Sequence, residues 1–417
     1  MRRQFLAGFA GSLLFAVWVS PVAAQAPAPE APGAVPAPPR TFAEALRRGE
    51  AKVSLNYRFE TVEDDGVPKD AHASTLRTTL SYRTSAFHGW SLFAEAENVA
   101  AIFDDDSYRN AGAGSLSNGV AGRPVIADPA LTAPLQVYVR YEQGPVRATL
   151  GRQEINLGDQ RFVGAVGWRQ HHQTFDALSV ELKPKGRVGF DYTFVDDVHR
   201  IFGDTRPLTA HLLDVPITLA KDQRLTVYGY YLDWQEVADA RRSTGTFGAE
   251  LVGSANIGGG AKLRWEAEFA NQQAVADNPD SVDASYYNAR LGIERSGFAA
   301  SVAWEVLEGG SGGAFQTPLA TLHKWNGWAD KFLTTPAAGL ETLYLQLSGP
   351  LGSTRWMVVY LDFQANAVPA DYGSEIDAQL TWKAPWAQTF GLKIARYYAD
   401  GFSTDTNKVM VWSGYTF

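Results

Sequence analysis

The chain has 417 residues, of which 45% are hydrophobic and 12% aromatic, and it carries a formal net charge of −8 without a single cysteine. The lack of cysteine excludes a fold held together by disulfides, and the acidic balance argues against nonspecific nucleic-acid binding. These totals suit soluble and membrane proteins alike, so the order of the residues has to decide the class.

Residues 1–24 have the three parts of a secretory signal. Two arginines follow the initiating Met, an apolar run covers residues 5–19, and the small-residue sequence VAA closes the segment at 22–24. We predict cleavage before Gln25. Beyond that point no stretch has the roughly 20 consecutive apolar residues of a membrane helix.

Residues 25–50 are predicted to be a leader. Its first part, 25–40, is rich in Pro and Ala, which is typical of an extended, flexible segment. Thr41 and Glu44 then have the spacing of a capping box, which predicts a short helix ending near Gly49. A linker element is favoured over a periplasmic plug or tether, because short amphipathic segments of this kind are common.

From Lys52 onward the apolar residues recur at every second position. In KVSLNYRFE (52–60) the apolar face carries Val53, Leu55, Tyr57 and Phe59. The same alternation returns in LRTTLSYR, LQVYVRYE, KLRWEAEF and IDAQLTWK, so each is predicted to be a strand with one apolar and one charged face. RWMVVYLDF is apolar on both faces. In GLKIARYY, Arg396 falls in phase with two apolar residues, which a bulge or a strand end would explain.

The sequence divides into about 18 such strands, a number within the range of bacterial outer-membrane barrels. They are expected at residues 52–60, 74–84, 88–98, 133–143, 145–154, 173–184, 187–197, 209–216, 223–235, 245–252, 260–271, 283–294, 297–307, 340–349, 353–365, 372–384, 388–398 and 407–417. Every second connection is short (SAFH, QG, PKG, ERSG, GPLG). Long connections are expected at 61–73, 99–132, 155–172, 198–208 and 308–339.

Loops sorted by length distinguish a membrane barrel from a soluble β sandwich or propeller, in which the two ends of the sheet have no reason to differ. Aromatic residues gather beside the short turns, as in an interfacial girdle: Phe87, Trp90, Phe298, Trp386 and Phe390. The sequence therefore predicts that residues 51–417 form an all-β, closed antiparallel transmembrane barrel with short periplasmic turns and long extracellular loops. Since a bilayer tolerates no open sheet edge, the last strand, ending in Phe417, must pair with the first.

The charged faces should line the lumen, which is an aqueous channel in barrels of this size. Inward arginines recur along the chain at Arg58, Arg77, Arg83, Arg140, Arg147, Arg264 and Arg290. Rings of such residues select anions in pores. The same faces carry acids at Glu60, Glu95, Glu97, Glu142, Glu266, Glu268 and Glu294. Arg–Glu ladders that merely stabilise a polar interior are therefore the alternative explanation.

The segment LGRQEINLGDQRFVG…GWRQHHQTFDA (150–177), together with LNYRFE, LRTTLSYRT and FAEAENV, resembles the alginate export family of outer-membrane porins. The resemblance extends from about residue 52 to residue 417. It implies an 18-stranded monomeric barrel with an Arg-rich constriction that passes an anionic polysaccharide outward. It further implies that Arg152, Arg161 and Arg169 are pore or inward-loop residues, with Asp176 and Glu95 as their ion-pair partners.

Four other motifs carry weaker signals. His171-His172 could bind a metal, but hydrogen-bonding histidines are favoured, since neighbouring strand residues point to opposite faces. The acidic run at 104–106 suits a solvated loop better than a calcium or lipopolysaccharide contact. EGGSGG at 308–313 lacks the Lys-Ser/Thr of a phosphate loop. Glu95 and Glu97 share a face like paired catalytic carboxylates, but no sugar cleft accompanies them.

The predicted function is a passive outer-membrane channel for alginate-like polyuronate or related anionic solutes, with no enzyme activity, cofactor or metal. The pore-lining candidates are Arg58, Arg77, Arg83, Arg140, Arg152, Arg161, Arg169, Arg264, Arg290, Glu95 and Asp176. Outer-membrane lipid, lipopolysaccharide, the barrel-assembly machinery and an anionic oligo- or polysaccharide are the expected partners; nucleic acid is not. Selective uptake of small anions or sugars, and a barrel hydrolase, remain alternatives.

Overall fold

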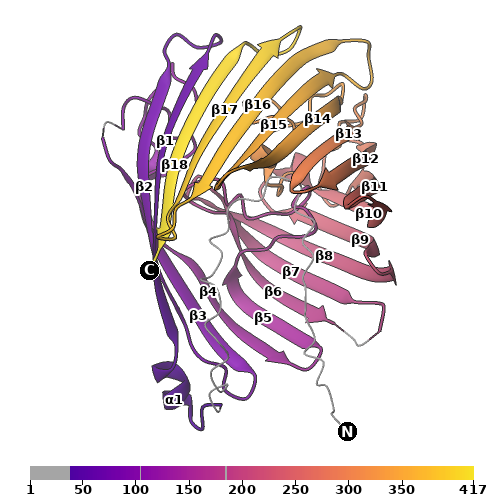
Figure 1. The fold of residues 1–417 in the computed structure, drawn as a ribbon. Helices are drawn as coiled ribbons and strands as arrows, with labels where there is room; N and C mark the ends of the chain where they lie inside the picture. Colours follow the sequence, from indigo (N-terminus) through magenta and orange to yellow (C-terminus); the bar gives the residue numbers. More distant parts are fainter. Residues whose placement is uncertain (1–37, 104, 184–185) are drawn as a thin grey trace.

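The computed structural model describes residues 38–103, 105–183 and 186–417, and in this part of the chain one antiparallel sheet contains 18 strands (Figure 1). The strands are β1 (Glu50–Asp64), β2 (Ala71–Arg83), β3 (Trp90–Ala101), β4 (Leu131–Gln143), β5 (Val146–Gln153), β6 (Thr174–Leu182), β7 (Phe190–His199), β8 (Thr205–Ala220), β9 (Gln223–Trp234), β10 (Thr244–Gly258), β11 (Ala261–Ala274), β12 (Asp283–Arg295), β13 (Phe298–Leu307), β14 (Leu340–Leu351), β15 (Thr354–Gln364), β16 (Asp371–Lys383), β17 (Thr389–Ala399) and β18 (Thr406–Thr416). A helix, α1 (Phe42–Arg47), precedes them, and short 3₁₀ turns lie at Gly114–Leu116, Ala240–Arg242 and Leu322–Lys324.

The sheet closes into a barrel because β18 pairs with β1. Their antiparallel register runs from Ser54 opposite Thr416 to Asp64 opposite Thr406. The Phe417 N–H extends this ladder by donating to the Val53 carbonyl over 2.8 Å. The aromatic chain end is therefore the closing seam of the barrel, as the alternation predicts, and it leaves no open strand edge there.

Apolar and polar residues alternate between the two faces of the wall. On β1, Val53 and Phe59 are exposed on the outer face, whereas Arg58 and Glu60 are buried inside. Trp90, Phe298 and Trp386 are exposed beside the short turns, where an aromatic girdle is expected. No helix of the described residues is long and apolar enough to cross a membrane.

Two of the five connections predicted to be long are short. Since β1 continues to Asp64 and β2 begins at Ala71, only residues 65–70 connect them. Extension of β7 and β8 likewise reduces their connection to 200–204. These strands continue to pair beyond their apolar residues. Because their end residues are polar, the alternation of apolar residues does not indicate this extension.

The two irregular strands have different explanations. The inner face of β15 is apolar because Met357, Leu361 and Phe363 belong to a hydrophobic core inside the barrel. On β17, Arg396 lies near the strand end and pairs with Asp405 over 3.1 Å, so its outward position requires no bulge.

Helix α1 lies against the β2–β3 turn, as Figure 1 shows. The Thr41 hydroxyl caps it by accepting the Glu44 N–H over 3.1 Å. The Tyr82 hydroxyl donates to the Leu46 carbonyl, and the Ser85 hydroxyl donates to the Arg48 carbonyl over 2.7 Å. These contacts place the helix at the rim of the barrel. The predicted signal and residues 25–37 of the leader lie outside the described residues.

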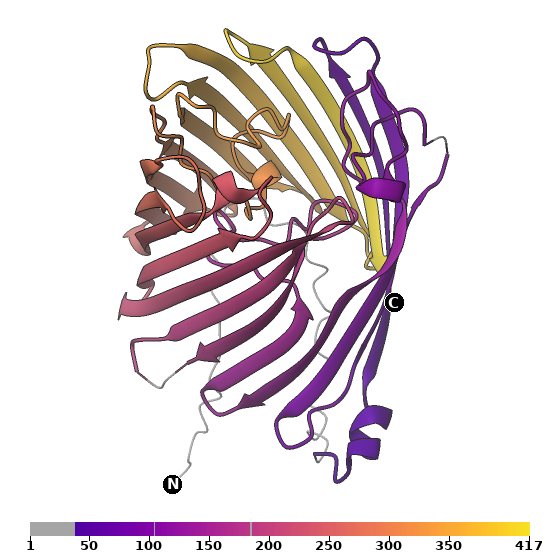
Figure 2. The same cartoon turned by 180° about the vertical axis from the view of Figure 1, so that it is seen from behind.

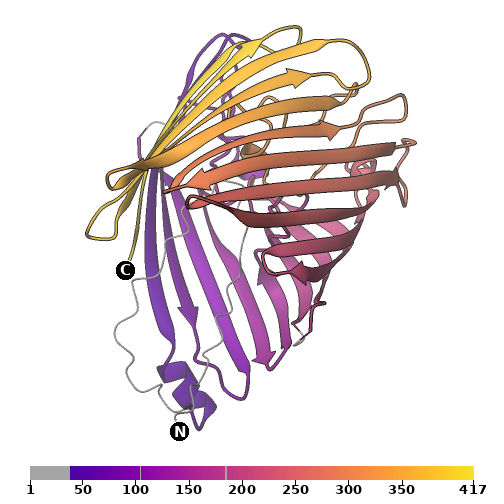
Figure 3. The ribbon, with the colours of Figure 1, turned by 45° about the vertical axis from the view of Figure 1, so that its right-hand side comes forward.

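Two long connections fold inward from the end opposite α1 (Figures 2 and 3). We call them the 154–173 loop, between β5 and β6, and the 308–339 loop, between β13 and β14. Their apolar residues pack onto the inner faces of the wall and form one core that includes Val163, Phe315 and Trp328. Part of the lumen is therefore dry, whereas the sequence predicts only that the lumen is an aqueous channel.

Candidate functional site

The two inward loops are joined to each other inside the barrel. The Gly164 N–H donates to the Leu319 carbonyl over 2.9 Å, and the Thr321 N–H donates to the Gln160 carbonyl over 3.1 Å. The side chains of Thr321 and Gln160 also bond over 2.7 Å. A displacement of one loop would therefore disturb the other.

Arg161 anchors the 154–173 loop to the wall at β13. It is only 1% exposed, and its Nε donates to Glu305 Oε1 over 2.6 Å. Tyr286 and Tyr344 donate to the same carboxylate over 3.0 and 2.8 Å, and Asn326 of the other loop donates to it over 2.9 Å. The Arg161 guanidinium is therefore neutralised by Glu305, and the ion pair holds the 154–173 loop against the wall.

Arg169 forms a second anchor, at β1 instead of β13. It is 6% exposed and pairs with Glu60 of β1 over 3.1 Å and with Asp330 of the 308–339 loop over 3.3 Å. Arg58, 3% exposed, pairs with Asp128 over 3.1 Å. Like Arg161, these two predicted pore residues are buried in ion pairs.

Asp330 is the meeting point of three cationic or donor side chains. Besides Arg169, Lys408 of β18 donates to it over 2.5 Å and His323 Nδ1 over 2.8 Å. Burial raises the pKa of Asp330, but Lys408, His323 and Arg169 lower it more, so the net pKa is well below the ordinary value. The carboxylate is therefore ionised and holds the 308–339 loop against the wall.

His323 is held in its neutral form within the same cluster. Burial lowers its pKa to about 3, against the opposing effect of Asp330. Its Nε2 faces Lys393 at 3.3 Å, and its ring stacks on Trp168 at 5.0 Å. A neutral ring that donates from Nδ1 to Asp330 and accepts at Nε2 from Lys393 satisfies all three groups.

We expect acid to loosen the 308–339 loop. Above pH 6.5 a released and a docked His323 are both neutral, so pH has no effect through this group. Between pH 6.5 and about 3 only the released ring binds a proton, so docking should lose about 1.4 kcal/mol per pH unit. Single-channel records from pH 7 to 4 should show rising open probability in wild type and a flatter profile in His323→Gln. Equal profiles would contradict this.

The wall formed by β2, β3 and β4 carries a different group, which we call the lumen patch: Arg83, Phe93, Tyr138 and Arg140. Arg83 pairs in register with Phe93, and Phe93 with Tyr138. The two rings stack at 5.0 Å; Arg83 lies 4.8 Å from the Phe93 ring centre, and Arg140 lies 4.9 Å from that of Tyr138.

Both arginines of the patch have neutral hydrogen-bond partners among the described residues. Arg83 donates to the Tyr138 hydroxyl and Arg140 to the Thr149 hydroxyl, each over 3.1 Å. Both side chains remain partly exposed on the lumen wall. Within the described residues neither guanidinium is paired with a carboxylate, unlike those of Arg161 and Arg169.

The other predicted site residues lie in wall contacts of intermediate exposure. Arg152 pairs with Asp176 through two bonds of 3.0 and 3.1 Å, and this is the predicted ion pair. Glu95 accepts from Gln136 over 2.9 Å instead of meeting an arginine of the 150–177 segment. The remaining contacts are Arg77 with the Gln170 carbonyl and His172, Arg264 with Glu294, and Arg290 with Glu266.

The adjacent histidines act as hydrogen-bonding groups. His171 contacts Glu97, and His172 contacts Glu154 over 2.7 Å as well as Arg77. They lie in the 154–173 loop and not on a strand, so the strand argument used for them does not apply, although their contacts are of the favoured kind. Glu97 is occupied by His171 and is buried.

The comparisons with known proteins concern most of the chain. A family model described as alginate export matches residues 51–307. None of the curated proteins matches the sequence. Similar folds occur in Acinetobacter baumannii OccAB2 (TM-score 0.72; 89% of this chain, 98% of that chain), Pseudomonas aeruginosa OccK9 (0.71; 89% and 99%) and P. aeruginosa OpdK with vanillate (0.70; 88% and 98%). Each is 12% identical to this sequence, so the likeness concerns the fold.

Proposed function

The chain belongs to the alginate export family, and we propose that its lumen passes an anionic polysaccharide of the polyuronate type by passive diffusion. The motif resemblance seen in the sequence is thereby confirmed. The protein is an outer-membrane channel and not an enzyme, and a single chain closes its barrel. The identity of the solute is the proposed part.

The lumen patch is the observation that carries the proposal. A uronate ring has a carboxylate, which a guanidinium binds by charge-assisted hydrogen bonds. Its C–H face suits stacking on an aromatic ring, and Phe93 offers a partly exposed ring beside Arg83, stacked on the buried Tyr138 next to Arg140. Because both cations have neutral partners, a passing carboxylate need not displace a protein carboxylate.

Uptake of small aromatic acids is the second candidate. The structurally similar OpdK was solved with vanillate, an aromatic carboxylate, and the patch could accept such a ring as well. The two candidate solutes differ in length. A polyuronate would make several contacts in the lumen at once and should therefore block current far better than its monomer.

We expect the channel to be anion-selective in planar bilayers and to be blocked by oligouronate. A hydrogen bond to a charged group contributes about 1.5 kcal/mol. Arg83→Gln or Arg140→Gln should therefore raise the half-blocking oligouronate concentration about tenfold each.

Arg187→Gln is the matched control, since it removes one positive charge from an exposed turn residue away from the patch. Its block should equal that of wild type. Cation preference without block by oligouronate would defeat the polyuronate proposal, and stronger block by vanillate than by oligouronate would favour the uptake candidate.

A further inference from the structure

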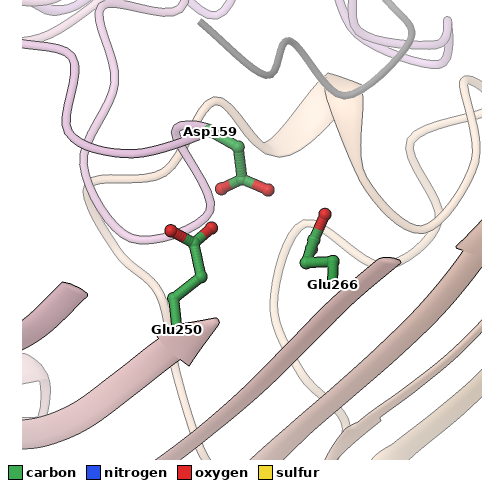
Figure 4. A group of neighbouring side chains, drawn as sticks. All are labelled: Asp159, Glu250 and Glu266. Atoms are coloured by element: carbon green, nitrogen blue, oxygen red, sulfur yellow. The ribbon is translucent and has the colours of Figure 1, made fainter. Parts of the chain in front are cut away.

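Three carboxylates converge where the 154–173 loop meets the barrel wall (Figure 4). Asp159 belongs to the loop, Glu250 to β10 and Glu266 to β11. One oxygen from each lies within 4.8 Å of the others. A fourth acid, Glu268, pairs in register with Glu250 across the two strands. Like charges in such positions repel, so this group of acids is stable only if nearby positive charge offsets the repulsion.

The cationic side chains near the four acids offset only part of this negative charge. Arg224 approaches Glu250 at 3.5 Å, and Arg290 approaches Glu266 at 3.9 Å, both longer than a normal charge-assisted bond. The Lys324 ammonium donates to the backbone carbonyl of Asp159 and not to its carboxylate. Within the described residues, the negative charge is therefore incompletely neutralised at close range.

Asn288 provides a second, independent observation. This inward residue of β12 is 3% exposed, and its side-chain amide contacts Glu266. Its Oδ1 atom has no hydrogen-bond partner among the described residues, nor has Asp159 Oδ2, and both atoms are buried. A buried acceptor without a partner costs about 1–3 kcal/mol. A bound cation would accept these oxygens as ligands and would also offset the charge of the neighbouring carboxylates.

We infer that Asp159, Glu250, Glu266 and Asn288 form a binding site for Ca²⁺. The three carboxylates supply oxygen donors, to which Asn288 adds an unpaired carboxamide oxygen; oxygen donors suit a hard cation, and no His or Cys is among these residues. Ca²⁺ tolerates irregular geometry and can complete its shell with water, whereas Mg²⁺ requires a nearly ideal octahedron.

The site would link the 154–173 loop to β10 and β11. Asp159 lies two residues before Arg161, so the cation would act beside the Arg161–Glu305 anchor. Calcium would then neutralise repulsion that otherwise pushes Asp159 away from the wall. This function does not depend on which solute the channel carries.

The test is calorimetric titration of Ca²⁺ into the full-length protein, refolded free of lipopolysaccharide and treated with chelator. Wild type should bind one more Ca²⁺ ion than Glu266→Gln. Asp159→Asn should weaken that site at least about tenfold. Asp65→Asn, an exposed acid of the β1–β2 connection, should leave it intact.

Heat-modifiable gel migration would verify that each variant forms a closed barrel, and Asn288→Ala gives a further variant that keeps every carboxylate. Weakened binding in Asn288→Ala would support the site. Equal Ca²⁺ stoichiometry and affinity in wild type, Glu266→Gln and Asp159→Asn would overturn it.

Discussion

Asp330→Asn should raise the single-channel conductance several-fold, because it removes the charge that docks the 308–339 loop. Lys408 is 4% exposed and would lose its carboxylate partner. An unpaired buried charge costs about 3–5 kcal/mol. Arg169 would keep Glu60, and the interactions of β18 with β1 would be unchanged. The loop should therefore leave the lumen while the barrel stays closed.

The double variant Asp330→Asn/Lys408→Met separates the charge effect from the loss of a contact. With no buried ammonium left unpaired, it should regain part of the docking free energy, so the two substitutions should be non-additive. Asp400→Asn, on an exposed turn, should conduct like wild type. Conductance of Asp330→Asn at the wild-type level, with the 308–339 loop equally protected from protease, would contradict the docking role.

The barrel was predictable because its pattern is local. Alternation on each strand, short turns and the aromatic chain end each need only a few neighbouring residues, and all 18 predicted strands overlap strands of the structure. The boundaries of β8 and β10 were the least accurate, since both strands extend well past their apolar bands.

The contents of the lumen were less predictable, because inward arginines look alike in sequence. Arg161 and Arg83 both lie in polar surroundings along the chain, yet one contacts Glu305, 144 residues away, and the other a tyrosine of the neighbouring wall. Which arginine is neutralised depends on how the inward loops fold back. Alternation cannot specify that.

The side chains around Asp330 are not predictable from the sequence for the same reason. Lys393, Asp330 and His323 have no motif in common, and 63 residues separate Asp330 from Lys393 in the sequence. One signal is present in the sequence: both faces of β15 are apolar. An apolar inner face indicates that apolar side chains of a loop pack against it inside the lumen. Phe332 of the 308–339 loop does so, packing on Phe363 at 4.5 Å.

Arg161→Met should destabilise the docked 154–173 loop by about 3–5 kcal/mol, because Glu305 would remain as a buried charge without its cation. Tyr286, Tyr344 and Asn326 would still donate to it, but neutral donors do not replace a guanidinium. Hydrogen exchange of residues 154–173 should accelerate accordingly, while exchange in β1 and β18 should not change.

Glu305→Gln should have a similar cost, since it leaves Arg161 buried and uncompensated, and the double variant Arg161→Met/Glu305→Gln should recover much of the loss. Arg152→Met, at a half-exposed pair, should cost no more than about 1 kcal/mol. Equal protection of the loop in all these variants would mean that the apolar core alone holds it. If instead each single substitution strongly lowers the protection of the loop and the double substitution lowers it little, the charges inside this barrel divide into two kinds. Pairs such as Arg161–Glu305 position the loops, and guanidiniums such as Arg83 remain available to a solute.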